Sequence, residues 1–424
     1  MDREPLLVAL AVVVVIFIYS QQSPRKRKCS HRAPFNRHYK RRFIAACPGE
    51  SGPRVILPHD FDFLNDVEFK QKYKYQKKTF VKLILLLDAA LKPKNKANGL
   101  SIPSGVQVAI VIRWFAGGSP SDISSDHGIN KKAVVPIAWK VAEAVILNGD
   151  NVGKIEFRPE DPSFLLGVAE GFGKSRPRNP LASVCVGCLD GLAVKIIQPS
   201  SRECPNVRDY RNRKGFYAVV VEAICDSRRK FLFFACQWPG STHDSAAFAC
   251  TSLYQFVCSS LLCDTCFIAC DEAYPITGAL ICPYPGGKSG RLEPFVDSFN
   301  FHLSQLRINI EDAFGMFVQR WGILWKKLAI DYRKVPRLLT ALAHLHNFAI
   351  DEDGLQRDFI SWEDIETATR STLFQNDIET GPPTGLASTL SSTPVTAKAR
   401  AKKFRDDCVE ALRTRGLMRP RRST

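Results

Sequence analysis

The pattern of apolar and polar positions divides the chain into zones of different character. Residues 60–150 carry apolar side chains at helical spacing, which predicts an α-helical region. Residues 180–350 alternate short apolar runs with longer helical patterns, which is typical of an α/β domain. Residues 1–45 and 370–424 show no such periodicity, so two folded regions are expected between two irregular ends.

Within the helical region, two neighbouring helices are predicted around a glycine. Residues 119–122 (SPSD) offer a capping serine, a proline for the first turn and an acid at capping-box spacing. Gly128 ends that helix, and residues 131–148 form a second, amphipathic one. This outline is typical of a helix-turn-helix, in which Lys131 and Lys132 would contact DNA; an ordinary helical hairpin in a bundle is the alternative.

The α/β zone places two acids at the ends of apolar strands. Residues 184–189 form the first strand and deliver Asp190 at its far end. Residues 216–236 form a hairpin of two strands with turn residues at its tip. A short strand at 267–270 then delivers Asp271.

A third acid, Glu311, lies on a long helix predicted over residues 299–328. One face of this helix is apolar at helical spacing and is expected to pack on the sheet. Its members are Ile310, Phe314, Phe317, Trp321, Leu324 and Leu328. The predicted catalytic domain is therefore a mixed sheet flanked by helices.

Three acids delivered by strand, strand and helix suit phosphodiester chemistry. Cleavage by water needs an activated nucleophile and charge compensation on the leaving oxygen, and two divalent ions about 4 Å apart supply both. Mg²⁺ takes oxygen ligands, as does Mn²⁺, and clustered carboxylates are costly unless cations neutralise them. The sequence thus predicts Asp190, Asp271 and Glu311 as the catalytic metal ligands of a two-ion centre.

Each acid taken alone has an ordinary structural interpretation. Asp190 precedes a glycine and could be a turn residue, and Asp271 could cap a helix. Glu311 could pair with Arg307 one helical turn earlier, a weak surface interaction. Only their joint order along the chain favours a metal centre.

The amino-acid composition indicates a polyanionic binding partner. The formal net charge is +17, and Lys or Arg that neutralise phosphates release condensed counterions, so nucleic acid is the first candidate and an acidic membrane surface the second. The fourteen cysteines are scattered, many inside apolar runs, as in buried free thiols of a reducing compartment. Two CxxC pairs, 185–188 and 263–266, leave a zinc protein as an alternative, although their separation is far from that of a compact zinc ribbon.

The chain ends carry signals for localisation. Residues 6–19 form an almost unbroken apolar run, shorter than the about 20 residues of a membrane-spanning helix. Positive charge follows this run at 24–28 (PRKRK), whereas it precedes the run in a signal peptide. The basic stretch is typical of nuclear import, and the apolar run leaves a membrane-anchored or secretory protein as the alternative. Residues 370–424 are predicted to be a disordered basic tail.

Five short motifs resemble those of PIF/Harbinger-type DDE transposases, over roughly residues 100–350. In order they are 212–216 (NRKGF) running on to 223–226 (AICD), then 238–244 (WPGSTHD), 271–275 (DEAYP), 310–315 (IEDAFG) and 345–347 (LHN). The chain departs from the family at Leu192 and Ala193, where a Thr-His pair is common, and at Cys270, where a Gly is usual. Neither departure touches a predicted ligand.

The resemblance implies an RNase H-like α/β fold and a cut-and-paste transposase that acts on transposon ends and target DNA. It implies Asp190, Asp271 and Glu311 as ligands of Mg²⁺ or Mn²⁺, with Asp244 as a further candidate near the metal. It also implies a nuclear location and a separate Myb-like DNA-binding partner. Arg213 and Lys214, in the first motif, are candidates for DNA contact, and a homo-oligomer is a further expectation. The rival interpretation is a domesticated DNA-binding protein that no longer cuts.

Overall fold

The computed structural model describes residues 56–92, 102–259, 265–286, 292–355 and 394–419. Two compact units are present. The first comprises the described residues up to Lys154 together with 320–326 and 337–354, and the second comprises the rest. The apolar run at 6–19 lies outside the described residues. Within the part that is described, no helix is both long and apolar enough to span a membrane.

The first unit is helical, as the sequence predicted. Its helices are α3 (Ile56–Phe63), α4 (Asp66–Tyr73), α5 (Lys77–Leu91), α6 (Ser104–Phe115), α7 (Pro120–His127), α8 (Val134–Leu147) and most of α13 (Val335–Asp353). Helix α6 is buried along almost its whole length and packs against α5 and α8, as expected for a helix that is apolar on all sides.

The predicted helix-turn-helix outline is present in α7 and α8. The Ser119 hydroxyl accepts a hydrogen bond from the Asp122 amide (3.1 Å), and Gly128 ends α7 in a left-handed conformation (φ 60°) that a glycine adopts without strain. Helix α8 begins at Val134, slightly later than predicted, because Lys131–Ala133 form a 3₁₀ turn. Lys131 and Lys132 are exposed on this turn.

Most of helix α13 packs with the helical unit, because residues 337–354 belong to that compact unit. The buried Tyr75 hydroxyl donates to the Leu345 carbonyl (3.0 Å), and the Trp321 indole donates to the Leu342 carbonyl (3.1 Å). These contacts link segments distant in sequence, which no local pattern reports.

The second unit is built on a five-stranded mixed sheet, which confirms the predicted α/β class and agrees with an RNase H-like domain. The strands are β1 (Cys185–Lys195), β2 (Ala218–Cys225), β3 (Phe231–Pro239), β4 (Phe267–Ala269) and β5 (Leu280–Ile281), in the order β3-β2-β1-β4-β5. The first three are antiparallel, and β4 runs parallel to both β1 and β5.

Two predicted elements have different ends. Asp190 lies inside β1 and not at its far end, because β1 continues to pair with β2 as far as Lys195. The long helix is α12 (Pro294–Arg320), which ends earlier than the predicted residue 328. A short 3₁₀ turn, Gly322–Trp325, follows it.

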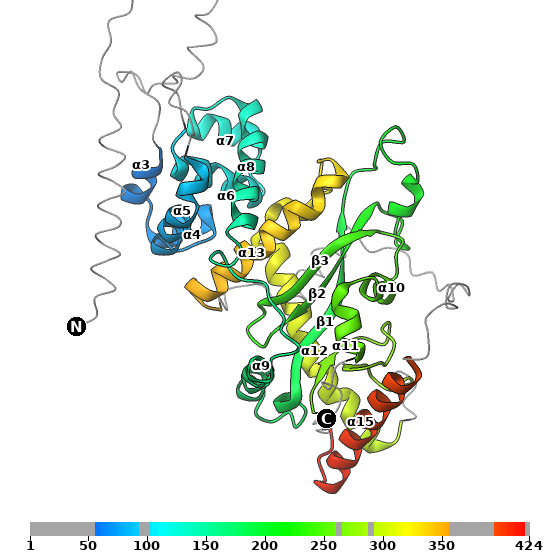
Figure 1. Cartoon of the computed structure of the whole chain (residues 1–424). Helices are drawn as coiled ribbons and strands as arrows, with labels where there is room; N and C mark the ends of the chain where they lie inside the picture. Colours follow the sequence, from blue (N-terminus) through cyan, green and yellow to red (C-terminus); the bar gives the residue numbers. More distant parts are fainter. Residues whose placement is uncertain (1–55, 93–101, 260–264, 287–291, 356–393, 420–424) are drawn as a thin grey trace, which may run out of the picture. The chain divides into compact units, whose positions relative to one another are not determined.

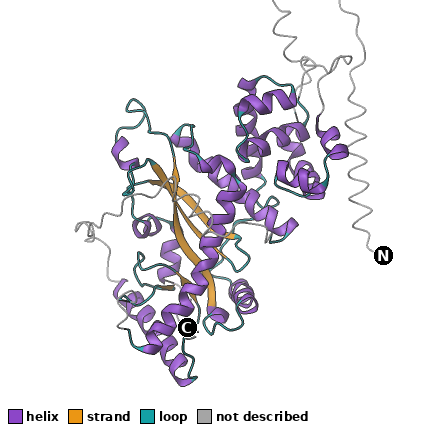
Figure 2. Ribbon diagram, turned by 180° about the vertical axis from the view of Figure 1, so that it is seen from behind, coloured by secondary structure: helices purple, strands orange, loops and turns teal. Residues whose placement is uncertain are grey.

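Helix α12 lies across one face of the sheet (Figure 2). All members of its predicted apolar face are buried. The rings of Phe314 and Phe317 contact the Phe231 ring of β3, with centroids 5.9 and 5.5 Å apart. Further helices of this unit are α9 (Pro162–Ser175), α10 (Asp244–Ala249) and α11 (Ser252–Ser259).

The C-terminal region corrects another prediction. Residues 370–424 were expected to be disordered, yet Pro394–Thr414 form helix α15, which packs against α11 and β5. The Arg405 guanidinium lies 3.7 Å from the centroid of the Tyr284 ring and donates to the Cys282 carbonyl (3.3 Å). The helix forms because Ala397, Ala401, Val409 and Leu412 give it one buried apolar face.

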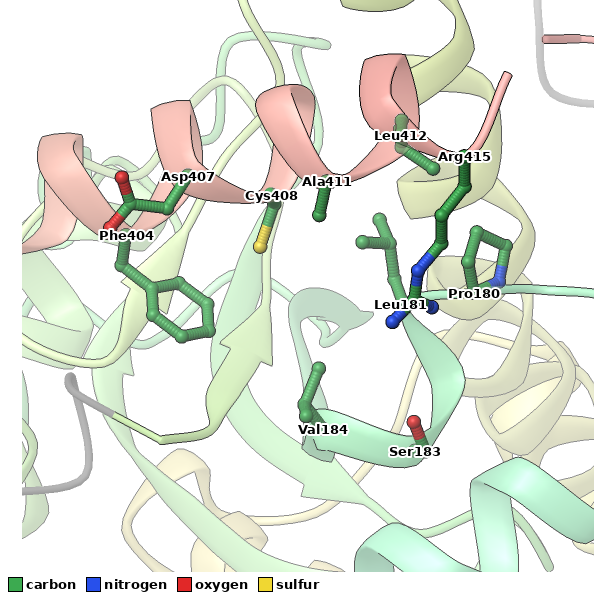
Figure 3. Close-up of a pocket in the computed structure, with 10 residues that line it drawn as sticks. All are labelled: Pro180, Leu181, Ser183, Val184, Phe404, Asp407, Cys408, Ala411, Leu412 and Arg415. Atoms are coloured by element: carbon green, nitrogen blue, oxygen red, sulfur yellow. The ribbon is translucent and has the colours of Figure 1, made fainter. Parts of the chain in front are cut away.

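A groove of about 340 Å³ lies between α15 and the segment that leads into β1 (Figure 3). Phe404, Cys408 and Leu412 line it from the helix, and Leu181 and Val184 line it from the other side. Its lining is mixed, because Ser183, Asp407 and Arg415 lie beside these apolar side chains.

Candidate active site

Asp190 and Asp271 occupy equivalent positions on neighbouring parallel strands. Strand β1 pairs with β4 so that Cys188 lies opposite Ala269. Each acid follows two residues later, so the two acids are in register, Asp190 within β1 and Asp271 just after the end of β4. The two apolar runs recognised in the sequence therefore bring their acids together by parallel pairing.

Asp190 is the more enclosed of the two. Its Oδ1 accepts a hydrogen bond from the Gly191 amide (2.9 Å). Burial raises its pKa to about 7; the hydrogen bond and Arg307 oppose this, whereas the charges of Asp244 and Asp271 add to it. A carboxylate in this position would be stabilised by a cation.

Arg307 is the cation that the structure places there. Its guanidinium lies 3.4 Å from Asp271 Oδ1 and 3.4 Å from Glu311 Oε1. The ion pair between Glu311 and Arg307 that the sequence suggested is therefore present. Glu311 still remains a candidate site residue, because the same guanidinium also contacts Asp271. The sequence offered Arg307 only as a helix neighbour and gave no sign of this second contact.

Asp244 lies against the backbone next to Asp190. A Cβ placed on Gly191 would lie 2.7 Å from the Asp244 Cγ, so the missing side chain provides the space for this carboxyl group. Helix α10 begins at Asp244 with His243 in the N-cap position, so Asp244 is not the residue that caps this helix. Burial raises the pKa of Asp244, and Arg213 and His243 oppose that rise.

A fifth acid, Glu222, was missed by the sequence analysis. It is fully buried on β2, and the Tyr274 hydroxyl donates to its Oε2 (2.7 Å). Burial is the main cause that raises its pKa to about 9, so it is protonated near neutral pH. A single Glu inside the otherwise apolar run 218–225 (AVVVEAIC) was the signal that could have revealed it.

The candidate ligands are of the chemical type that a hard divalent cation prefers. Asp190, Asp244, Asp271 and Glu311 offer only carboxylate oxygens, and the raised pKa of Asp190 reflects a charge that burial leaves poorly compensated. Within the described ranges, however, no three Asp, Glu, His or Cys side chains converge closely enough to hold an ion. Arg307 separates two of the acids, so metal binding would require that guanidinium to move.

One of the basic candidates, Arg213, lies close to an acid. Arg213 and Lys214 are exposed on the loop between β1 and β2, and Arg213 is near enough to Asp244 to lower its pKa. Burial lowers the pKa of Lys195, and the neighbouring charges of Lys327 and Lys214 lower it further. Lys195, Lys214 and Lys327 therefore form one positively charged cluster in the second unit, and we call it the basic cluster.

The first CxxC pair is part of the core. Cys185 and Cys188 are buried free thiols, and Cys188 Sγ donates to the Leu306 carbonyl of α12 (3.0 Å). Of the second pair, Cys263 lies outside the described residues and Cys266 is a buried free thiol.

Residues 189–347, which include all three predicted catalytic acids, match the profile of the family described as DDE superfamily endonuclease. This segment therefore belongs to that class of protein, and the predicted resemblance to Harbinger-type DDE transposases is confirmed. A particular relative is the "Protein ALP1-like" of Arabidopsis thaliana, 23% identical over 311 residues, which cover 68% of this chain and 72% of that protein. No solved structure gives a significant match.

Proposed function

We propose that the protein is a metal-dependent DNA endonuclease and strand transferase that cuts phosphodiester bonds at transposon ends. The observation that carries this proposal is the parallel register of β1 and β4, which aligns Asp190 with Asp271. The contacts of Arg307 with both Asp271 and Glu311 support it, because they put these two acids within reach of one guanidinium.

In this proposal Asp190, Asp271 and Glu311 hold a pair of Mg²⁺ or Mn²⁺ ions, and Asp244 is a further ligand candidate. Such ions, when bound, activate water and neutralise charge on the leaving oxygen. Gly191 keeps the Asp244 carboxyl group close to Asp190. Without ions, Arg307 neutralises part of the charge of Asp271 and Glu311, and it would compete with an ion for these two acids.

The proposed substrate is DNA, both at transposon ends and at the target. The net charge of +17, the exposed Arg213 near Asp244 and the basic cluster support contacts with DNA phosphates. Lys131 and Lys132 on the helix-turn-helix are the proposed contacts of the first unit. A nuclear location, a Myb-like partner and a homo-oligomer belong to the same proposal.

A second candidate is a DNA-binding protein that descends from such a transposase and no longer cuts. The position of Arg307 between two of the acids favours it, since a cation of the chain already occupies part of the site. The two candidates differ in whether divalent ions bind and whether DNA is cleaved.

The deciding experiment is a Mn²⁺-dependent cleavage assay on supercoiled DNA and on DNA that carries transposon ends. The parent and Asp190→Ala are compared, and DNA affinity is measured for both. Cleavage by the parent alone supports the endonuclease. Equal DNA binding by both proteins, with no cleavage by either, supports the second candidate.

A further inference from the structure

Glu222 and Tyr274 form a buried hydrogen-bonded pair beside the acids. Their side chains are 0% and 2% exposed, and Tyr274 donates to Glu222 Oε2 at 2.7 Å. Among the described residues, Glu222 Oε1 has no hydrogen-bond partner. A buried carboxyl group is costly, so a fold that retains one beside other acids calls for a physical reason.

The pair joins two parts of the sheet that are not neighbours. Glu222 lies on β2 opposite Gly191 of β1, whereas Tyr274 lies in the loop that follows β4. Strand β1 stands between β2 and β4, so this hydrogen bond spans the strand that carries Asp190.

Tyr274 is also tied to Asp271. Its amide donates to the Asp271 carbonyl (3.1 Å) and closes a turn that begins at the acid. Strand β4 has only three residues and ends before Asp271, so the acid itself lies in the turn and not in the paired strand. The tyrosine thus has one hydrogen bond at the Asp271 turn and another on β2.

We propose that Glu222 and Tyr274 are positioning residues that set the place of Asp271 relative to Asp190. Glu222 acts as a neutral acceptor for the tyrosine hydroxyl and is not itself a metal ligand. This inference rests on the proposed function. The position of Asp271 affects metal binding only if Asp271 is a metal ligand.

The test compares Tyr274→Phe and Glu222→Gln in the full chain. Phenylalanine keeps the ring and removes the donor, whereas glutamine keeps a neutral oxygen acceptor. Tyr254→Phe is the matched control, since the rings of Tyr254 and Tyr274 both contact Phe248 and only Tyr274 bonds to Glu222.

Two quantities are measured: Mn²⁺ affinity, from the paramagnetic resonance of free Mn²⁺, and hydrogen exchange of residues 271–279 in metal-free protein. Tyr274→Phe is expected to weaken Mn²⁺ binding about tenfold, as loss of an outer support of a metal ligand does. It is also expected to speed exchange in the turn. Glu222→Gln and Tyr254→Phe are expected to match the parent in both quantities.

Two results would overturn the proposal: Mn²⁺ binding lost in Glu222→Gln, which would make Glu222 a charged ligand, or a Tyr274→Phe variant identical to the parent. Failure of the proposed function gives a different result, since the parent itself would then bind no Mn²⁺. In that case faster exchange in Tyr274→Phe still supports the positioning role, and unchanged exchange refutes it.

Discussion

Arg307 of α12 forms an ion pair with Asp271, which follows β4, at 3.4 Å. The pair crosses from the helix to the sheet edge and places a positive charge where the proposed function needs a metal ion. Because the same guanidinium contacts Glu311, it compensates two of the three acids at once. This relationship leads to the first prediction.

Replacement of Arg307 by Gln is expected to tighten Mn²⁺ binding about two- to fivefold. The Mn²⁺ ion would no longer compete with the Arg307 guanidinium, whose partly exposed ion pairs are of modest strength. The metal-free protein is expected to melt at a lower temperature, since Asp271 and Glu311 lose their shared cation. Calorimetric Mn²⁺ titration and thermal unfolding measure the two effects. Arg229→Gln is the control, because Arg229 pairs with Asp312 on the same helix. Weaker Mn²⁺ binding in Arg307→Gln would contradict the competition.

Two adjacent acids on α12 should behave differently. Glu311→Gln is expected to lower the cleavage rate by about 10³-fold, equivalent to the several kcal/mol that a metal centre supplies. Asp312→Asn is expected to retain the parent rate, because the Asp312 carboxylate pairs with Arg229 (2.9 Å) instead of facing the site acids. Single-turnover cleavage of end-bearing DNA measures both. Equal loss in the two variants would mean that the helix, and not Glu311, was disturbed.

Gly191 is expected to tolerate no side chain. Gly191→Ala would place a methyl group 2.7 Å from the Asp244 Cγ, so the carboxyl group must move away from Asp190. The cleavage rate should fall by at least the factor seen in Asp244→Ala, measured in the same assay. Gly167→Ala on α9 is the control: nothing lies within 4 Å of its Cβ position, and removal of a helical glycine should stabilise the protein by about 0.5–1 kcal/mol. Full cleavage activity in Gly191→Ala would show that the position of the Asp244 carboxyl group does not affect cleavage.

The burial of His127 predicts that the free energy of unfolding falls in acid. It is 3% exposed, both of its ring nitrogens lack partners among the described residues, and burial lowers its pKa to about 4. The unfolded chain binds a proton near pH 6.5, whereas the folded chain resists it down to about pH 4. Stability is therefore full above pH 6.5 and falls between pH 6.5 and 4.

The expected loss from His127 is about 2 kcal/mol at pH 5, from 1.36 kcal/mol for each unit between pH 6.5 and 5. Urea unfolding at pH 7.5 and pH 5 measures it. His127→Phe should lose less on acidification, and the exposed His243→Gln should lose as much as the parent. An identical pH dependence in His127→Phe would exclude this histidine as the cause.

Much of the fold and the main acids followed from the sequence alone. The strands before Asp190 and Asp271 and the helix that carries Glu311 were all recognisable, because alternation and helical spacing report the local backbone geometry of each segment. The helix-turn-helix outline was recognisable for the same reason, since a capping serine and a left-handed glycine act within a few residues. The family resemblance rested on short motifs of the same local kind.

Other features depended on contacts between distant segments. The alignment of Asp190 with Asp271 needs the parallel register of β1 and β4, and the double contact of Arg307 needs α12 to cross the sheet edge. The burial of Glu222 likewise comes from neighbours on other strands and loops. Pairing and packing between elements set these positions. The sequence of one segment does not show which other segment will pack against it. The sequence therefore determined which residues could do chemistry, and the tertiary structure decided which of them meet.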